Sequence, residues 1–160
     1  GSRVAELCHL FGCEIAAYDL FPKKNAPEYL HYGTLEEVLS KSDIVTLHCP
    51  LTEDSRNLIN QDRIAQMKKG AILINAARGP IVDSKALADA LNSGYLRGAG
   101  VDVFEMEPPL PMDHPLLHSI NTIVTPHIAF ASDESMEIRA KIVFENIQKW
   151  MNKEQVNTIL

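Results

Sequence analysis

Short apolar segments alternate along this chain with segments in which apolar residues recur at helical spacing. The apolar segments are too short for helices but long enough for buried strands, and they lie at 14–18, 44–47, 71–74, 98–104 and 121–125. The segments between them carry apolar residues three and four positions apart, which is typical of amphipathic helices. Strands that alternate with helices predict βαβ units and a parallel α/β sheet.

The ends of the predicted helices carry capping signals. Thr34 and Glu37 form a capping box, Asn60 begins the next helix, and Asp83 or Ser84 begins the helix that ends at Gly94. Ser132 or Asp133 begins a long final helix to about Met151. Its expected buried stripe is Met136, Ala140, Val143, Ile147 and Met151.

The start of the chain is predicted to form a helix, and residues further along are predicted to form a loop. Val4, Leu7, Cys8 and Phe11 fall on one helical face, and Gly12 closes that helix as a glycine with a left-handed backbone. Residues 21–33 are predicted to form a loop.

Polar residues follow the predicted strands where each strand ends: Asp19, His48, Arg78, Asp102 to Glu107, and His127. Right-handed crossovers bring these ends to one edge of the sheet, where parallel α/β sheets bind ligands. In the stretch Asn75 to Pro80, small residues flank Arg78, whose planar guanidinium suits a substrate carboxylate. The alternative is a surface arginine in a turn.

Asp19 lies where dinucleotide-binding folds place the carboxylate that binds ribose, although an ordinary turn aspartate would look the same. No arginine follows it directly, which favours NAD over NADP. Lys23 and Lys24 keep NADP open as the less favoured cofactor.

Composition narrows the class of protein. The 160 residues suit one domain, or one domain with a tail, and the formal charge of −6 argues against nucleic acid and anionic membranes as partners. No apolar run approaches the roughly 20 residues of a membrane span. Cys8, Cys13 and Cys49 lack metal-ligand spacing, so we expect no metal site and a reducing, cytoplasmic location.

Three motifs resemble the NAD-dependent D-2-hydroxyacid dehydrogenases: N-A-A-R-G-P-I-V-D from Asn75, G-V-D-V-F-E-M-E-P from Gly100, and T-P-H-I-A from Thr125. Tyr18-Asp19 and L-H-C-P-L-T from Leu47 agree with the same family. The resemblance covers nearly the whole chain and implies a doubly wound Rossmann sheet that lacks its first strand here.

The family's glycine fingerprint follows that first strand, and Gly1 resembles its third glycine. We therefore expect residues 1–130 to be a nucleotide-binding domain incomplete at its N-terminus, and 131–160 a helix that returns toward a substrate domain. Without the central strand, neighbouring strands lose hydrogen-bond partners, so these 160 residues are expected neither to fold stably nor to turn over substrate alone.

The resemblance implies three catalytic residues. Arg78 would bind the substrate carboxylate and polarise the keto oxygen, and His127 would be the general acid in reduction. Glu107 would hydrogen-bond His127 and favour its charged form, with Glu105 as a rival for that role. His9 and His31 are interpreted as surface residues, and His114 and His118 as solvated ones.

For the cofactor, the resemblance assigns Asp19 to the adenine ribose, Asp102 to the nicotinamide carboxamide, and the N-terminus of the first helix to the pyrophosphate. The full set of expected cofactor-binding residues is Gly1, Ser2, Asp19, His48, Cys49, Pro50, Ala76, Ala77, Arg78, Asp102, His127 and Ala129.

The function implied first is reduction of 2-keto acids with NADH by a cytoplasmic homodimer. A corepressor-like protein that binds NAD on the same scaffold is the alternative from another class, because such proteins can keep the same three residues. A phosphite-type dehydrogenase is a third interpretation. Formate enzymes of this fold lack the acidic partner, so Glu107 counts against formate.

Overall fold

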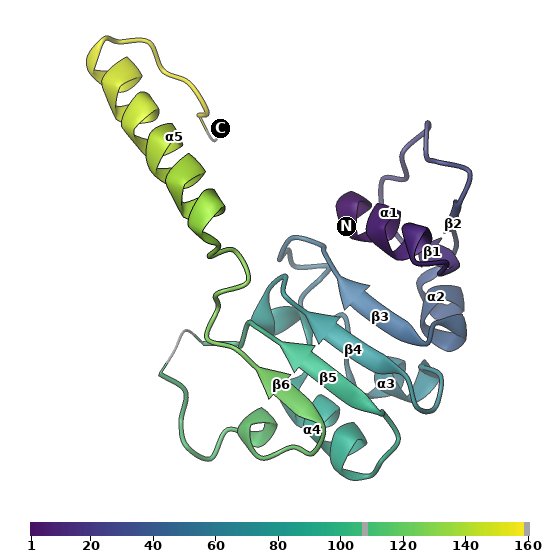
Figure 1. Cartoon of the computed structure of the whole chain (residues 1–160). Helices are drawn as coiled ribbons and strands as arrows, with labels where there is room; N and C mark the ends of the chain where they lie inside the picture. The colour runs from purple at the N-terminus through teal and green to yellow at the C-terminus, as the bar shows by residue number, and fades with distance from the viewer. Residues whose placement is uncertain (107–108, 159–160) are drawn as a thin grey trace. The chain divides into compact units, whose positions relative to one another are not determined.

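The computed structural model describes residues 1–106 and 109–158, and the chain divides into two compact units, Gly1–His127 and Ile128–Leu160 (Figure 1). In chain order the elements are α1 Ser2–Leu10, β1 Ile15–Ala17, β2 Leu30–Tyr32, α2 Leu35–Lys41, β3 Ile44–Leu47, α3 Gln61–Gln66, β4 Ile72–Asn75, the 3-10 helix η1 Gly79–Ile81, α4 Ser84–Asn92, β5 Gly98–Val101, the 3-10 helix η2 Pro115–Leu117, β6 Thr122–Val124 and α5 Asp133–Met151.

All strand pairs are parallel, which confirms the predicted fold class. The strands β3, β4, β5 and β6 form one sheet in that order, and β1 pairs with β2 in a second sheet. The prediction of a loop throughout residues 21–33 was wrong, because Leu30–Tyr32 pairs with Ile15–Ala17. Three residues are too few to show a period-2 pattern, so this strand gave no signal in the sequence.

The helices bury one face of the four-stranded sheet. Val45, Leu73 and Ala99 are paired across neighbouring strands, and all three are buried. Leu39 of α2, Ile64 of α3, and Leu87 and Leu91 of α4 join them in one hydrophobic core, and Figure 1 draws α3 and α4 behind the sheet.

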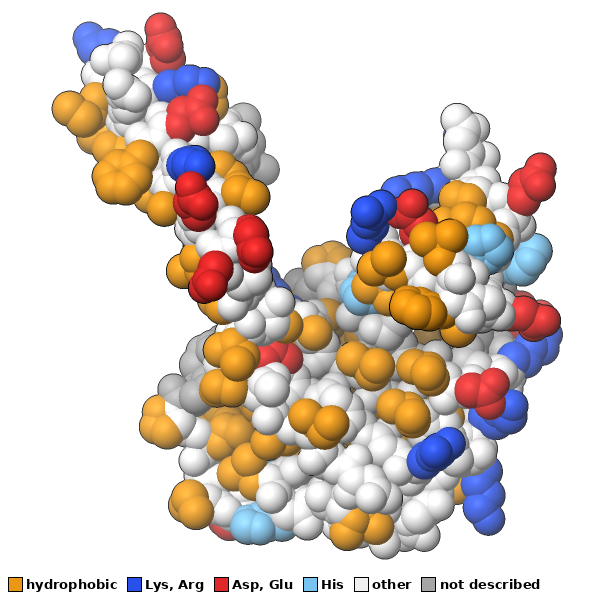
Figure 2. Space-filling view, in the orientation of Figure 1, with side chains coloured by type: hydrophobic (Ala, Val, Ile, Leu, Met, Phe, Trp, Pro, Cys, Tyr) orange, Lys and Arg blue, Asp and Glu red, His pale blue; other side chains and the backbone are white. Residues whose placement is uncertain are grey.

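The opposite face of this sheet is apolar and exposed. Its alternate residues include Ile44, Ile74 and Ile123, which are 56%, 38% and 72% exposed. Figure 2 shows apolar side chains spread over the sheet face that is turned toward the viewer. A doubly wound sheet normally carries helices on both faces, and within the described residues of Gly1–His127 this face has no covering layer.

The predicted helix ends are confirmed. The capping box of Thr34 and Glu37 forms, Asn60 caps α3, and Asp83 caps α4. Gly12 and Gly94 follow their helices with positive φ angles of 85° and 72°, a conformation that glycine adopts without steric cost.

The predicted buried stripe of α5 is wrong for the structure described. Ser132 caps the helix as expected, but no residue of α5 is buried, and Val143, Ile147 and Met151 are 48%, 50% and 70% exposed. Within this second unit, Arg139 covers the ring of Phe130 at 5.1 Å, and the apolar stripe has no partner element in the described part of the unit that could bury it.

Candidate functional site

The register of the sheet places the carboxyl ends of four strands in one row. Leu47 pairs with Asn75, Asn75 with Val101, and Val101 with Val124. The residues that follow this row are His48, Ala76, Asp102 and Thr125. The structure therefore brings together segments that lie far apart in the sequence, at the edge where parallel sheets bind ligands.

The side chain of Asn75 organises the loop that carries Arg78. This amide is 1% exposed, its Oδ1 accepts a hydrogen bond from the Ala77 N–H at 3.1 Å, and its Nδ2 donates to the Arg78 carbonyl at 3.1 Å. The Arg78 guanidinium is on the surface and donates to the Ala77 carbonyl at 2.7 Å. A buried amide thus fixes the backbone, while the charged group faces solvent where an anion can reach it.

Gly79 lets this loop pack directly on the segment after β5. A Cβ atom at residue 79 would lie 1.7 Å from the Phe104 carbonyl oxygen and 2.5 Å from the Glu105 nitrogen. Only a residue without a side chain fits such an approach of two backbones. The loop of Arg78 and the segment 104–105 are therefore in contact through backbone atoms.

Asp102 and His127 are joined at the ends of β5 and β6. The Asp102 carboxylate is 6% exposed and accepts a hydrogen bond from the Thr125 hydroxyl at 2.5 Å. The His127 N–H donates to the Asp102 carbonyl at 2.8 Å, and His127 has a positive φ of 58°. Thr125 was not singled out in the sequence, although it belongs to the T-P-H motif that drew attention to His127.

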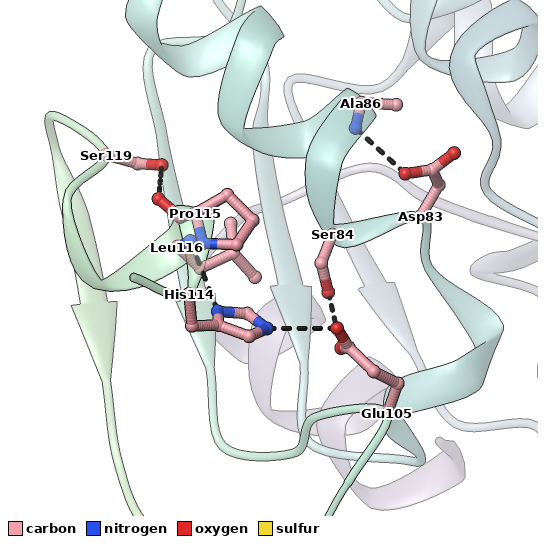
Figure 3. Close-up of polar contacts among 8 residues, drawn as sticks. All are labelled: Asp83, Ser84, Ala86, Glu105, His114, Pro115, Leu116 and Ser119. Carbon is pink, nitrogen blue, oxygen red and sulfur yellow. Dashed lines mark hydrogen bonds and ion pairs between the residues drawn. The ribbon is translucent and has the colours of Figure 1, made fainter. Parts of the chain in front are cut away.

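Glu105 lies in a hydrogen-bonded group with Ser84 and His114 (Figure 3). Burial of Glu105 raises the pKa of its carboxyl. Hydrogen bonds from its own backbone N–H, from Ser84 and from His114 outweigh burial and leave that pKa below its ordinary value. Glu107, the expected partner of His127, lies outside the described residues.

The expectation that His114 is solvated was wrong, because this histidine is 5% exposed. Its ring packs edge-on against Phe104 with a centroid distance of 5.3 Å, and its Nδ1 accepts a hydrogen bond from the Leu116 N–H. The nearby signal was Pro115, which stands at the first position of η2 and makes residue 114 a helix cap. His9, His31 and His118 are exposed, as expected.

Expected cofactor-binding residues at the ends of β1 and β3 and at the N-terminus of α1 lie near one another. A Cβ atom at Gly1 would lie 3.4 Å from the Cβ of His48, so the N-terminus of α1 adjoins the end of β3. Burial raises the pKa of the Cys49 thiol, and the neighbouring Asp19 carboxylate acts in the same direction. The Asp19 Oδ1 also accepts a hydrogen bond from the Phe21 N–H at 2.8 Å, as a turn aspartate does.

These residues fit the chemistry of a dinucleotide. In the nine-residue helix α1 no side chain caps the first backbone N–H groups, and the first turn carries no acidic residue, so these N–H groups suit a phosphate. Lys23 adds positive charge there, because its Nζ donates to the Ser2 hydroxyl at 3.0 Å. An exposed carboxylate, Asp19, follows β1 and suits ribose hydroxyls.

One expected cofactor-binding residue, Ala129, belongs to the second compact unit, Ile128–Leu160. The first unit also has a surface hollow of about 470 Å³, which is not at the carboxyl ends of the strands. It is lined by His9, Gly12, Cys13, Glu14, Tyr29 and His31.

Within residues 1–106 and 109–158, no group of three or more His, Cys, Asp or Glu side chains could hold a metal ion. No helix among them is long and apolar enough to cross a membrane.

Comparison with known proteins gives one consistent family. The model of the D-isomer specific 2-hydroxyacid dehydrogenase NAD binding domain matches residues 1–129. A glyoxylate reductase of Korarchaeum cryptofilum is 43% identical over 149 residues, which are 92% of this chain and 45% of that protein. A hydroxypyruvate reductase of Blautia hydrogenotrophica is 37% identical over 160 residues, or 99% of this chain and 49% of that protein.

Solved structures agree with this result. The D-lactate dehydrogenase of Lactobacillus jensenii, crystallised with NAD+, superposes with a TM-score of 0.89 at 33% identity over 100% of this chain and 52% of that one. The TT0316 protein of Thermus thermophilus gives 0.91 at 39% identity over 99% of this chain and 49% of that one. The chain thus spans about half the length of the relatives that it matches.

Proposed function

This chain belongs to the D-isomer-specific 2-hydroxyacid dehydrogenases, whose NAD-binding domain corresponds to residues 1–129, and from this premise we propose that the protein reduces 2-keto acids to D-2-hydroxy acids. Bound NADH would supply the hydride for the keto carbon. The observation that carries the proposal is the row of strand ends that brings the segments of Arg78, Asp102 and His127 to one edge of the sheet.

The chain would hold the dinucleotide from both ends. Gly1 and Ser2 would bind the pyrophosphate through backbone N–H groups, and Asp19 would bind the adenine ribose, with Cys49 and Pro50 beside the adenine. The backbone of residues 76–78 would line the nicotinamide ribose, and the buried Asp102 would accept a hydrogen bond from the carboxamide. The Asp19 carboxylate would repel a 2′-phosphate, which favours NAD over NADP.

Three side chains would act on the substrate. The exposed Arg78 guanidinium would bind the carboxylate of the keto acid and polarise its keto oxygen. The His127 imidazolium would donate a proton to that oxygen, and Glu107 would favour the imidazolium. Both carboxylate oxygens of the rival Glu105 already accept hydrogen bonds from Ser84 and His114, which supports Glu107 in this role.

Steady-state oxidation of NADH with a panel of 2-keto acids, run on the intact enzyme, tests the proposal. We expect turnover with at least one keto acid and only D-2-hydroxy acid as product. NADH binding without turnover of any keto acid would contradict the proposal and favour the corepressor-like function. Reduction of NAD+ by phosphite in place of that activity would favour the phosphite-type enzyme. The same panel run with NADPH tests the preference for NAD.

We also propose a cytoplasmic homodimer in which residues 1–130 form the cofactor domain and 131–160 return toward a substrate domain. The three cysteines are free thiols, which suits a reducing compartment. Light scattering of the purified enzyme would measure the assembly, and a monomer at working concentration would contradict the dimer.

A further inference from the structure

One carboxylate, that of Glu105, connects three segments of the chain near the carboxyl ends of the strands. Figure 3 shows Glu105 pointing toward both Ser84 and His114, and the Ser84 hydroxyl donates to its Oε2 at 2.8 Å. The other oxygen, Oε1, lies 3.0 Å from the Nε2 of His114. Ser84 is the first residue of α4, directly after the loop of Arg78 and η1, and His114 precedes η2.

The hydrogen bonds of His114 fix its role as a donor. Its Nδ1 accepts the Leu116 N–H at 3.3 Å, so the ring proton lies on Nε2 and points to Glu105. The His114 side chain is only 3% exposed, and the ring of Phe104 packs against it. The imidazole is therefore held rigidly and acts as an anchor for the carboxylate.

This group is not arranged as a nucleophilic triad. In such a triad, the imidazole accepts the proton of the serine and the carboxylate orients the imidazole. Here the carboxylate lies between the other two groups, and Ser84 donates to Glu105 rather than to His114. The arrangement holds segments together and gives no activated hydroxyl.

The anchored segment is in contact with the loop of Arg78. Because a Cβ at Gly79 would lie 1.7 Å from the Phe104 oxygen and 2.5 Å from the Glu105 nitrogen, the two backbones cannot shift independently. In the sequence, Glu107 follows Glu105 by two positions, and His114 closes the stretch 106–113. A displacement of Glu105 would therefore reach both Arg78 and the start of that stretch.

We propose that Glu105 is a positioning residue for keto-acid reduction, an inference that rests on the function proposed above. Its carboxylate sets the position of the Arg78 loop relative to the segment that precedes Glu107, without touching substrate. Reactions that depend on placed groups lose rate steeply when those groups shift. Most of the residues proposed to bind the cofactor, among them Gly1, Asp19 and Asp102, lie outside the Arg78 loop, so the affinity for NADH should depend little on this link.

The test is Glu105→Ala in the intact enzyme. We expect kcat to fall about 10- to 100-fold, while the Kd for NADH, measured by fluorescence titration, changes little. The Tm should fall slightly, because the buried His114 ring loses the acceptor of its Nε2–H. Glu105→Gln should recover part of the rate, because an amide oxygen accepts one of the two hydrogen bonds but the amide nitrogen cannot accept the other. Ser84→Ala removes a single hydrogen bond and should lower kcat less than Glu105→Ala.

Asp89→Ala is the matched control. Asp89 lies on α4, like Ser84, and forms an exposed ion pair with Lys85, so its loss removes a carboxylate without touching the anchor. We expect this variant to keep the kcat of the wild type. An unchanged kcat in Glu105→Ala would overturn the inference, and so would a parallel loss of kcat, NADH binding and Tm, which would indicate a merely structural role.

Amide hydrogen exchange separates this inference from the proposed reaction. Residues 79–82 and 104–106 should exchange faster in Glu105→Ala than in the wild type and in Asp89→Ala. A wild type that reduces no keto acid would defeat the proposed function, and the exchange data would still decide whether Glu105 anchors these segments. Unchanged exchange in both segments would overturn the anchor itself.

Discussion

His127 is held in a backbone conformation that few residues adopt. Its φ of 58° lies in the left-handed region, and its N–H donates to the carbonyls of Asp102 at 2.8 Å and Thr125 at 3.1 Å. Histidine tolerates this region better than most residues, and such conformations concentrate where surrounding structure imposes them at functional sites. The geometry therefore adds to the sequence argument for His127 as the proton donor.

His127→Ala should lower kcat of the intact enzyme about 10²- to 10⁴-fold, because the general acid is lost. NADH binding should survive, since the residues proposed to hold the dinucleotide are mostly elsewhere. His127→Asn is the matched control, because asparagine also tolerates a positive φ but cannot transfer a proton near neutral pH. Both variants should lose activity alike, as measured by steady-state kinetics. Near-normal turnover in either would remove His127 from its role.

Single residues could be predicted only where a motif or a strand end marked them. Arg78, Asp102 and His127 follow strands, and their neighbourhood could be derived from the parallel sheet. The link between Ser84 and His114 could not be predicted, because both residues bind Glu105 from separate segments of the chain. No periodic pattern in the sequence indicates that such segments are in contact. His114 looked like a solvated loop residue, and only its packing against Phe104 shows otherwise.

The helices of this chain depend on their caps, and α4 matters most because it follows the loop of Arg78. The Asp83 Oδ1 accepts a hydrogen bond from the Ala86 N–H at 2.9 Å. Asp83→Ala should lower the free energy of unfolding of the intact enzyme by about 1 kcal/mol, because that N–H loses its partner. The denaturant midpoint measures this change.

Asp89→Ala again serves as the control, since it removes an aspartate from the same helix but only an exposed ion pair. An equal shift of the midpoint in both variants would mean that charge, and not capping, causes the loss.

Whole elements were predicted well where local chemistry specifies them. The capping residues Thr34, Asn60 and Asp83 define their helices through hydrogen bonds to neighbouring backbone, so the sequence carries the information. The strand β2 depends instead on pairing with β1, which lies more than ten residues earlier, and its three residues carry no pattern. Strand β5 ends at Val101, earlier than the predicted Phe104, although Val103 and Phe104 are buried.

At the scale of the molecule, the fold class, the family and NAD as the cofactor of this domain were all predictable from motifs, and all three are confirmed. The exposure of α1 and α5, neither of which has a buried residue, was not predictable. Phe11 of the α1 segment is 87% exposed, and Trp150 of α5 is 65% exposed. An amphipathic pattern identifies the apolar face of a helix, but it does not identify the segment that packs against that face.

The 160 residues expressed alone should not unfold cooperatively. Among the described residues, β3 pairs only with β4 and β1 only with β2, so each of these two strands has one edge that no other strand pairs with. The bare sheet face with Ile44 and Ile123 adds exposed apolar area that water does not favour. Thermal scans followed by circular dichroism should therefore show a broad, gradual loss of signal and no dehydrogenase activity. A single sharp transition together with NADH-dependent keto-acid reduction would mean that the open edges and the bare face cost this chain less than the buried core provides.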